Sequence, residues 1–319
     1  MLDQLTAAWR ARRVLLIGGP DAQNLCMQEL LLALGARPAR IPDACKPHTL
    51  NRAMTTGRVS AVIVPSMHTL GAPGDLFSRL HALKTLLDEM REAGIPLCIL
   101  CSQEDVFAPG LSAAEETSPL GGKTQEGLIA ALLQLYADGA SRALLGDAVP
   151  TILCRHVPCL GSDHPSVYQY SRWCRALLRG RRATVEHPSA QGTFFHPLDA
   201  ALGALCLGAR YFSGDTTCTG AFHLPPSSEN RCANRSAYLA LAAMENSTRA
   251  PQETHPPCDA PFPLLRGDKI KKLCGYSPVL NARQALALLM EYERARAIGE
   301  SAAQIKRAEQ AEIFLKSLC

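Results

Sequence analysis

Short apolar runs alternate with longer amphipathic segments along the first half of the chain. The runs carry no polar alternation, which is typical of parallel strands buried on both faces. The predicted strands are 14–17, 37–41, 60–64, 97–101 and 151–154, and the predicted helices are 24–35, 76–93 and 124–136. Strands that alternate with helices of this length indicate right-handed crossovers. We therefore predict an α/β fold with a Rossmann-like, doubly wound parallel sheet, which binds ligands beyond the carboxyl ends of its strands.

The rhythm changes after residue 155. The predicted helices there are 167–178, 198–211, 236–246, 281–297 and 301–318, with one short strand at 221–224. We expect the last helix to dock on its own domain or on a second subunit through one apolar face, which carries Ile305, Ala308, Ala311, Leu315 and Leu318. The predicted organisation is a Rossmann-like domain over 1–154, rejoined by 187–214, a smaller C-terminal α/β lobe over 155–186 and 215–297, and a helical extension over 298–319.

A glycine turn follows the first strand and precedes the first long helix. Strand, glycine turn and helix open a dinucleotide-binding domain, because backbone N–H groups at the helix start must reach a pyrophosphate. The chain has Gly18, Gly19 and Pro20 at this turn. Against the motif G-x-x-G-x-x-G, only Gly18 fills a required place, and Asp21 and Asn24 occupy the other two. We predict Gly18 and Gly19 as cofactor-binding residues in a turn that has lost part of its chemistry.

An acidic residue follows the second predicted strand. Asp43 is placed to hold a ribose hydroxyl of NAD, as an acid at this strand end does in dinucleotide-binding domains. The competing interpretation is an ordinary loop or cap residue.

Composition narrows the class of protein. The chain has 319 residues, 47% of them hydrophobic, and a formal net charge of +4, which gives no indication of nucleic-acid binding. We expect no membrane span, since no apolar run approaches the roughly 18 residues required. The N-terminus lacks a signal-peptide core, and the 13 cysteines are odd in number and scattered, so we predict reduced thiols in a cytoplasmic protein.

Six stretches, in order along the chain, resemble one family. VLLIGGPDAQN at 14–24 stands where that family has V-L-V-T-G-x-T-G-F-x-G, and 99–107 is similar to its strand ending T-S-D-K-x-Y. The others are 119–122, which resembles the approach to a catalytic helix, 154–163 (A-R-x-x-N-V-x-G-x-G-D), 173–199 (ending R-P-W-Q-H-V-x-D) and 272–278 (K-L-G-W-x-P). The family is the extended short-chain dehydrogenase/reductases, and the resemblance is nearest to CDP-glucose 4,6-dehydratase and related nucleotide-sugar epimerases.

The resemblance implies a reaction. NAD oxidises the sugar at C4, water leaves C5–C6, and the hydride returns. A tyrosine takes the hydroxyl proton, and a lysine four residues later, on the same helix face, favours its phenolate form. The implied ligands are NAD and a nucleotide sugar.

The proton-transfer groups of the family are missing here. Its tyrosine position falls on Glu126 and its lysine position on Ala130, and none of the seven tyrosines has a lysine four residues later. After Ser102, Gln103 and Glu104 replace an Asp and a Lys, and an amide cannot act as a general acid. Ser102 and Glu126 are the candidate catalytic residues if the chain is active, and each has a structural alternative.

The stretch 173–199, which resembles the family's substrate-binding motif, keeps part of that motif. The arginine that holds the sugar-nucleotide diphosphate in the family falls on Gly192, whereas His196 and Asp199 match and are the candidate substrate-binding residues. Three places therefore depart from the family: the cofactor turn, the proton relay and the substrate-binding arginine.

The leading hypothesis is a catalytically degenerate nucleotide-sugar epimerase/dehydratase-like protein with a binding, regulatory or assembly role, for which NAD binding is doubtful. One alternative is an active NAD-dependent enzyme with altered catalytic residues. Another is a dimeric scaffold with no ligand, in which the last helix makes the interface. We expect a homodimer, and we expect no metal site, because Cys98 and Cys101 point to opposite faces of a strand.

Overall fold

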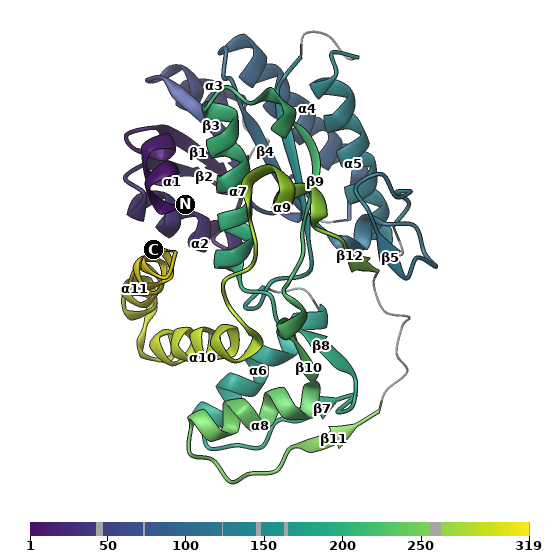
Figure 1. Cartoon of the computed structure of the whole chain (residues 1–319), viewed down its shortest axis with the longest axis vertical. Coiled ribbons are helices and arrows are strands. Elements are labelled where there is room, and N and C mark those ends of the chain that lie inside the picture. The colour runs from purple at the N-terminus through teal and green to yellow at the C-terminus, as the bar shows by residue number, and fades with distance from the viewer. Residues whose placement is uncertain are drawn as a thin grey trace.

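A six-stranded parallel sheet forms the centre of the molecule (Figure 1). The computed structural model describes residues 1–42, 47–72, 74–122, 124–144, 148–162, 165–255 and 263–318. The strands, in their order across the sheet, are β2 (Arg37–Ile41), β1 (Arg13–Ile17), β3 (Val59–Val64), β4 (Cys98–Gln103), β6 (Thr151–His156) and β9 (Gly220–Leu224). The predicted doubly wound α/β class is confirmed.

Helices cover both faces of this sheet. One side carries α1 (Leu2–Trp9), α2 (Ala22–Ala33) and α7 (Pro197–Phe212), and the other carries α3 (Pro47–Thr55), α4 (Leu76–Glu92) and α5 (Gln125–Ser141). Alternate strand residues enter separate cores, so Leu16 packs on one side and Leu15 on the other. Cys98 and Cys101 likewise lie in different cores, as the strand period requires.

The order of the strands differs from the usual dinucleotide-binding order. Numbered along the chain, the sheet reads 2-1-3-4-5-6, whereas the classic order is 3-2-1-4-5-6. Within the described ranges, no strand lies beyond β2, and the chain passes from β2 through α3 to β3. The order reverses between β1 and β3, which is where a doubly wound sheet places its ligand crevice.

A smaller lobe lies below the sheet in Figure 1. Its helices are α6 (Pro165–Leu178), α8 (Asn234–Met244) and α10 (Ala282–Ile298), and its strands pair as β7 (Thr184–Glu186) with β11 (Gln252–Thr254) and β8 (Gln191–Thr193) with β10 (Arg231–Ala233). Tyr170, Trp173, Phe194 and Tyr238 fill its interior. One part of the range expected for this lobe belongs elsewhere, because β9 pairs along β6 in the central sheet.

Short elements complete the chain. They are the 3-10 helices η1 (Met67–Thr69), η2 (Glu104–Val106), η3 (Thr216–Cys218) and η4 (Ser228–Asn230), the strand pair β5 (Ala113–Ala114) with β12 (Leu264–Leu265), and α9 (Asp268–Cys274). The 3-10 helices η1 and η2 follow β3 and β4 at the carboxyl edge of the sheet, so they border the candidate site.

The last helix, α11 (Glu300–Lys316), packs against α2 and α10 of its own chain. Ala311, Phe314 and Leu315 are buried there. Ile305, which the sequence pattern placed on the same face, is instead 61% exposed. Docking on its own domain is therefore confirmed, although the expected face was wrong at Ile305.

The described cysteines are all free thiols, and eight of the ten are buried. Among the described helices, none has the length and apolar character required to cross a membrane.

Candidate cofactor and substrate site

Gly18 ends β1 in a conformation that favours glycine. Its φ is +127°, and its N–H donates to the carbonyl of Ile41 at 2.9 Å. A Cβ atom here would lie 2.5 Å from Thr69 Oγ1 and 2.8 Å from Asn24 Nδ2. The predicted tight turn is therefore present, with two side chains packed against it. A Cβ on Gly19 would meet open space among the described residues.

The carboxylate of Asp21 caps the helix that follows this turn. Asp21 Oδ1 accepts from the backbone N–H of Asn24 at 2.8 Å, and Oδ2 accepts from Asn24 Nδ2 at 3.3 Å. Pro20 contributes no backbone N–H to the turn. The two residues in the places of the second and third motif glycines thus bond to each other, and the amino terminus of α2 already holds an anion.

These residues do not fit a pyrophosphate. One of the N–H groups that would bind it, that of Asn24, is engaged by the carboxylate of Asp21, and this negative charge at the helix terminus would repel a second anion. Asp43, the candidate ribose-binding residue, lies outside the described residues, so its assignment stays a prediction.

Removing the Asp21 cap should destabilise the protein measurably. We expect Asp21→Ala to lower the free energy of unfolding by about 1 kcal/mol, the usual cost of losing an N-cap side chain. Asp21→Ser should retain most of that stability, because a hydroxyl also accepts from the third helical N–H. Urea unfolding of the two variants measures the difference, and equal stabilities would show that the cap contributes nothing.

An ion pair occupies the place expected for the catalytic tyrosine. Glu126 lies in the first turn of α5, and its Oε2 is 2.7 Å from Nη1 of Arg79 on α4. Arg79 is almost fully buried, at 2% exposure. Ala130, in the lysine place, is buried in the same helix. Glu126 is therefore the charge partner of a buried arginine.

Two further polar residues lie at this edge and were missed from the sequence. His68 in η1 and Asp105 in η2 approach to 4.0 Å between Nε2 and Oδ1. Burial lowers the pKa of His68 to about 4, aided by Arg79 and opposed by Glu126, so the ring is neutral at pH 7. The available signal was their position, since each follows a predicted strand at its carboxyl end.

Ser102 is buried near the end of β4. It is 1% exposed, and its hydroxyl has no hydrogen-bond partner among the described residues. Gln103, at the last position of β4, is also buried. Ser102 Oγ and Gln103 Oε1 both lie inside the fold without exposed surface.

His196 and Asp199 both serve the start of α7. His196 Nδ1 accepts from the N–H of Leu198 at 3.2 Å, and burial lowers its pKa to about 3. The carboxylate of Asp199 accepts from the N–H groups of Val279 at 2.7 Å and Leu280 at 3.3 Å, while burial raises its pKa to about 7. His196 thus caps its own helix, whereas Asp199 ties α7 to the segment that precedes α10.

Gly192, in the arginine place, faces the interior of the smaller lobe from β8. A Cβ atom there would lie 2.4 Å from the hydroxyl oxygen of Tyr170, 2.8 Å from Asn234 Oδ1 and 3.0 Å from Phe194 Cζ. The Tyr170 hydroxyl itself donates to Asn234 Oδ1 at 3.1 Å. The position has no room for a methyl group as it stands, and still less for a guanidinium.

Comparison with solved structures identifies the fold. The chain is similar to the UDP-glucose 4-epimerase of Thermus thermophilus solved with NAD, at 17% identity and a TM-score of 0.69, over 88% of this chain and 99% of that one. It is also similar to the dTDP-glucose 4,6-dehydratase of Streptomyces venezuelae solved with NAD, at 16% identity and a TM-score of 0.70, over 91% and 99% of the two chains.

A third similar structure is an epimerase of Methanothermobacter thermautotrophicus, at 15% identity and a TM-score of 0.73, over 94% and 98% of the two chains. No model of a protein family matches the sequence, and no curated protein sequence does either. The structural likeness spans nearly the whole of each chain. The chain therefore has the fold of the extended short-chain dehydrogenase/reductases that act as nucleotide-sugar epimerases and dehydratases.

Proposed function

We propose that this chain is a catalytically degenerate form of the nucleotide-sugar epimerase/dehydratase fold, with a binding, regulatory or assembly role. The observation that carries the proposal is the Asp21 carboxylate on the amino terminus of α2. A dinucleotide places its pyrophosphate at that terminus, and the Asp21 carboxylate already supplies a negative charge there, so a second anion would be repelled. NAD binding is accordingly absent or weak.

Two other replacements support this proposal independently. The Arg79–Glu126 ion pair stands where a tyrosine would transfer a proton, and the aromatic interior around Gly192 fills the place of the diphosphate-binding arginine. At all three places the residue that replaces the family's group is bonded or closely packed within the fold. This supports the proposal that the packing was retained after catalysis was lost.

The ligand class proposed for the carboxyl edge of the sheet is a nucleotide sugar. A similar structure, the UDP-glucose 4-epimerase of Thermotoga maritima, was solved with UDP-glucose. The free thiols of the described cysteines fit a reducing compartment, so we place the role in the cytoplasm, within sugar-nucleotide or cell-surface polysaccharide metabolism.

A turnover assay tests the loss of catalysis. Purified protein with NAD and UDP-, dTDP- or CDP-glucose should form neither the C4 epimer nor a 4-keto-6-deoxy sugar. Because a ligand that binds the native state raises its melting temperature, thermal shifts with each sugar nucleotide measure binding separately. Turnover by the wild type that disappears in Glu126→Gln would contradict the proposal.

That contradicting result would favour the second candidate, an active enzyme with altered groups. The observation in its favour is the buried Ser102 hydroxyl, which has no hydrogen-bond partner in the described structure. A lone buried hydroxyl is costly, and catalytic sites are one place where such a cost is retained. In this candidate Ser102 would bind a sugar hydroxyl and Glu126 would take its proton.

We also propose a homodimer formed through α5. Leu128, Leu132 and Leu135 lie on one face of this helix and are 47%, 40% and 56% exposed. Residues three and four apart share a helix face, so the three leucines form a continuous apolar stripe that a second copy would cover.

Charge on this stripe should break the dimer. We expect Leu132→Asp to convert the wild-type dimer to a monomer in size-exclusion chromatography with light scattering, since it buries an unpaired charge in the interface. Ile313→Asp on α11, where the side chain is 65% exposed, is the matched control and should stay dimeric. The opposite pattern would place the interface on the last helix.

A further inference from the structure

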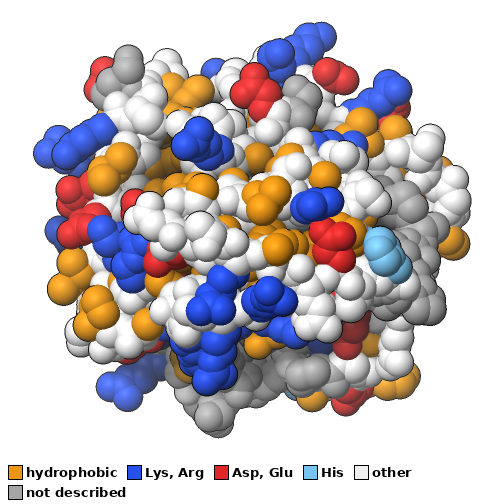
Figure 2. Space-filling view, turned by 90° about the horizontal axis from the view of Figure 1, so that it is seen from below, with side chains coloured by type: hydrophobic (Ala, Val, Ile, Leu, Met, Phe, Trp, Pro, Cys, Tyr) orange, Lys and Arg blue, Asp and Glu red, His pale blue; other side chains and the backbone are white. Residues whose placement is uncertain are grey.

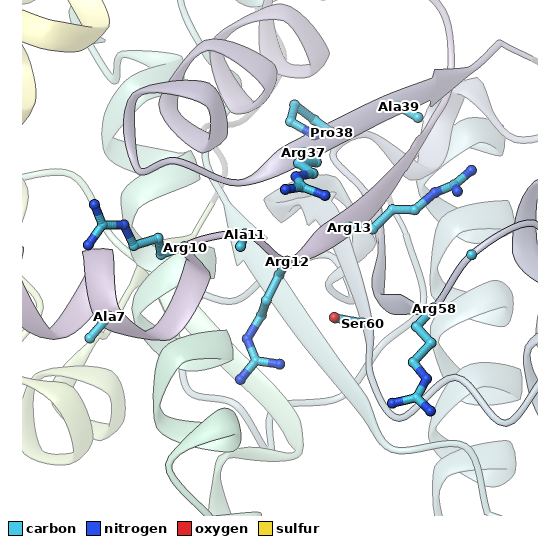
Figure 3. Close-up of a pocket in the computed structure, with 11 residues that line it drawn as sticks. Ala7, Arg10, Ala11, Arg12, Arg13, Arg37, Pro38, Ala39, Arg58 and Ser60 are labelled. Atoms are coloured by element: carbon cyan, nitrogen blue, oxygen red, sulfur yellow. The ribbon is translucent and has the colours of Figure 1, made fainter.

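A basic pocket lies at the amino ends of the strands, on the edge of the sheet opposite to the candidate site. Its volume is about 750 Å³, and five arginines line it: Arg10, Arg12, Arg13, Arg37 and Arg58 (Figure 3). Doubly wound sheets bind their usual ligands beyond the carboxyl ends of the strands. This pocket is therefore separate from any cofactor or sugar site of the fold.

The parallel sheet itself brings these arginines together. Arg10 and Arg12 lie in or beside the connection between α1 and β1, Arg13 and Arg37 begin β1 and β2, and Arg58 directly precedes β3. Strands that run in parallel start at the same edge, so residues from four segments meet there.

In the part of the chain that the structure describes, no acidic side chain pairs with this group. Among the described residues, none of the five arginines has a carboxylate within 4.0 Å, although arginines elsewhere in the fold, such as Arg210 and Arg294, do. The face seen from the side of the smaller lobe carries acidic as well as basic side chains, and several of the basic ones lie together (Figure 2). The pocket is thus a local concentration of positive charge in a chain whose net charge is only +4.

Two of the guanidinium groups are held in place by the protein. Arg13 donates to the backbone carbonyls of Thr56 and Ala53. The guanidinium of Arg12 lies 3.8 Å from the ring centroid of Phe212, and its Nε donates to the carbonyl of Ala8. Arg10, Arg37 and Arg58 have no side-chain partner among the described residues and extend around the pocket (Figure 3). A side chain that is already held in place loses less conformational entropy when a ligand binds. The two held guanidinium groups therefore favour a binding site over a chance cluster of arginines.

We propose that this pocket binds a small molecule that carries a chain of phosphates. Planar guanidinium groups pair with phosphate oxygens in bidentate fashion, and five of them from four segments exceed what one phosphate can contact. The volume lies in the ordinary range for a small ligand. The rest of the lining is mostly small and aliphatic, with Ala7, Ala11, Pro38 and Ala39.

That lining also argues against a nucleic acid. Recognition of single strands relies on exposed aromatic rings for base stacking, and none of the described residues that line the pocket is aromatic. The arginines of the pocket can bind phosphate groups, and the lining residues that the structure describes include no aromatic side chain on which a base could stack. The phosphate chain can be free or the tail of a nucleotide, and the two sources are separable by experiment.

Calorimetric titration with inorganic tripolyphosphate at about 0.1 M salt tests the site. We expect one molecule per chain and an affinity that falls as salt is added. The double variant Arg37→Ala/Arg58→Ala should bind at least tenfold more weakly. The control Arg181→Ala/Arg182→Ala removes the same charge from exposed residues of the smaller lobe and should stay within twofold of the wild type. Circular dichroism confirms that each variant is folded.

Further titrations separate the possible ligands. Inorganic phosphate should bind at least tenfold more weakly than tripolyphosphate. Equal affinity for ATP and tripolyphosphate supports a free phosphate chain, and tighter binding of ATP supports a nucleotide tail. The proposal is overturned if tripolyphosphate does not bind, if single phosphate binds as well, if both double variants lose affinity equally, or if duplex DNA at equal phosphate concentration binds more tightly.

Discussion

Between about pH 6.5 and pH 4 the free energy of unfolding should fall by several kcal/mol. The cause is a set of histidines that the fold keeps neutral. Burial lowers the pKa of His156 to about 4, that of His196 to about 3 and that of His223 to about 4. All three rings are buried. In the unfolded chain each would titrate near its ordinary pKa of 6.5.

The sign follows from where protons bind. As the pH falls below 6.5, these histidines bind protons in the unfolded state but not in the native state. The free energy of unfolding therefore decreases until the pH reaches the native pKa values. At 1.36 kcal/mol per pKa unit, the three groups together amount to on the order of 10 kcal/mol, comparable to the whole stability of a domain. Asp199 and Glu29 act in the opposite direction, because burial raises the pKa of each carboxyl group and so favours the native state at low pH, which offsets part of this loss.

Urea unfolding at pH 7, 6, 5 and 4.5 measures this loss. His196→Asn should make the dependence less steep, because asparagine also caps a helix and does not take up a proton. His81→Asn is the control, since His81 is exposed on α4, and it should leave the dependence unchanged. A stability that stays constant between pH 7 and 5 would contradict the account of the buried histidines.

Gly192→Arg, which restores the arginine of the resembled family, should destabilise the protein by at least about 3 kcal/mol. The added Cβ alone would lie 2.4 Å from the Tyr170 hydroxyl oxygen, and Tyr170 is itself buried. The rest of the side chain would either displace Tyr170 and Phe194 from the lobe interior or leave a charge among them. A loss of this size exceeds what most surface substitutions cause.

The neighbouring residue provides the control. Gln191 is exposed on the same strand, so Gln191→Arg should change the free energy of unfolding by less than about 0.5 kcal/mol. If Gly192→Arg is as stable as this control, position 192 has room for an arginine side chain, and this part of the lobe can still hold a diphosphate-binding group.

Most of the central sheet was predictable because the strands β1, β3, β4 and β6 are buried on both faces. That burial forces continuous apolar runs such as Val14–Ile17, which no surface strand would carry. The strand pairs of the smaller lobe were not predictable, because β8 and β10 have three residues each and show no period. The face of α11 was misjudged at Ile305 because its buried side includes the polar residues Arg307 and Gln310.

Some features of the candidate site were likewise predictable from the sequence, and others were not. The departures at Asp21, Glu126 and Gly192 were visible as missing residue types. That Asp21 caps α2 follows from local spacing, whereas the pairing of Glu126 with Arg79 depends on how α4 and α5 pack. Contacts of that kind carry no local signal, and the strand order 2-1-3-4-5-6 is equally a property of the assembled sheet.

Direct titration of the purified protein with NAD tests the central claim, which is that the turn at Gly18 no longer accepts a pyrophosphate. The account predicts no saturable binding at NAD concentrations up to about 1 mM, corresponding to less than about 4 kcal/mol of binding free energy. Asp21→Gly/Asn24→Gly, which restores both motif glycines, is the matched comparison and should bind more tightly than the wild type. Micromolar binding of NAD by the wild type, weakened by a Gly18→Ala substitution, would contradict the account.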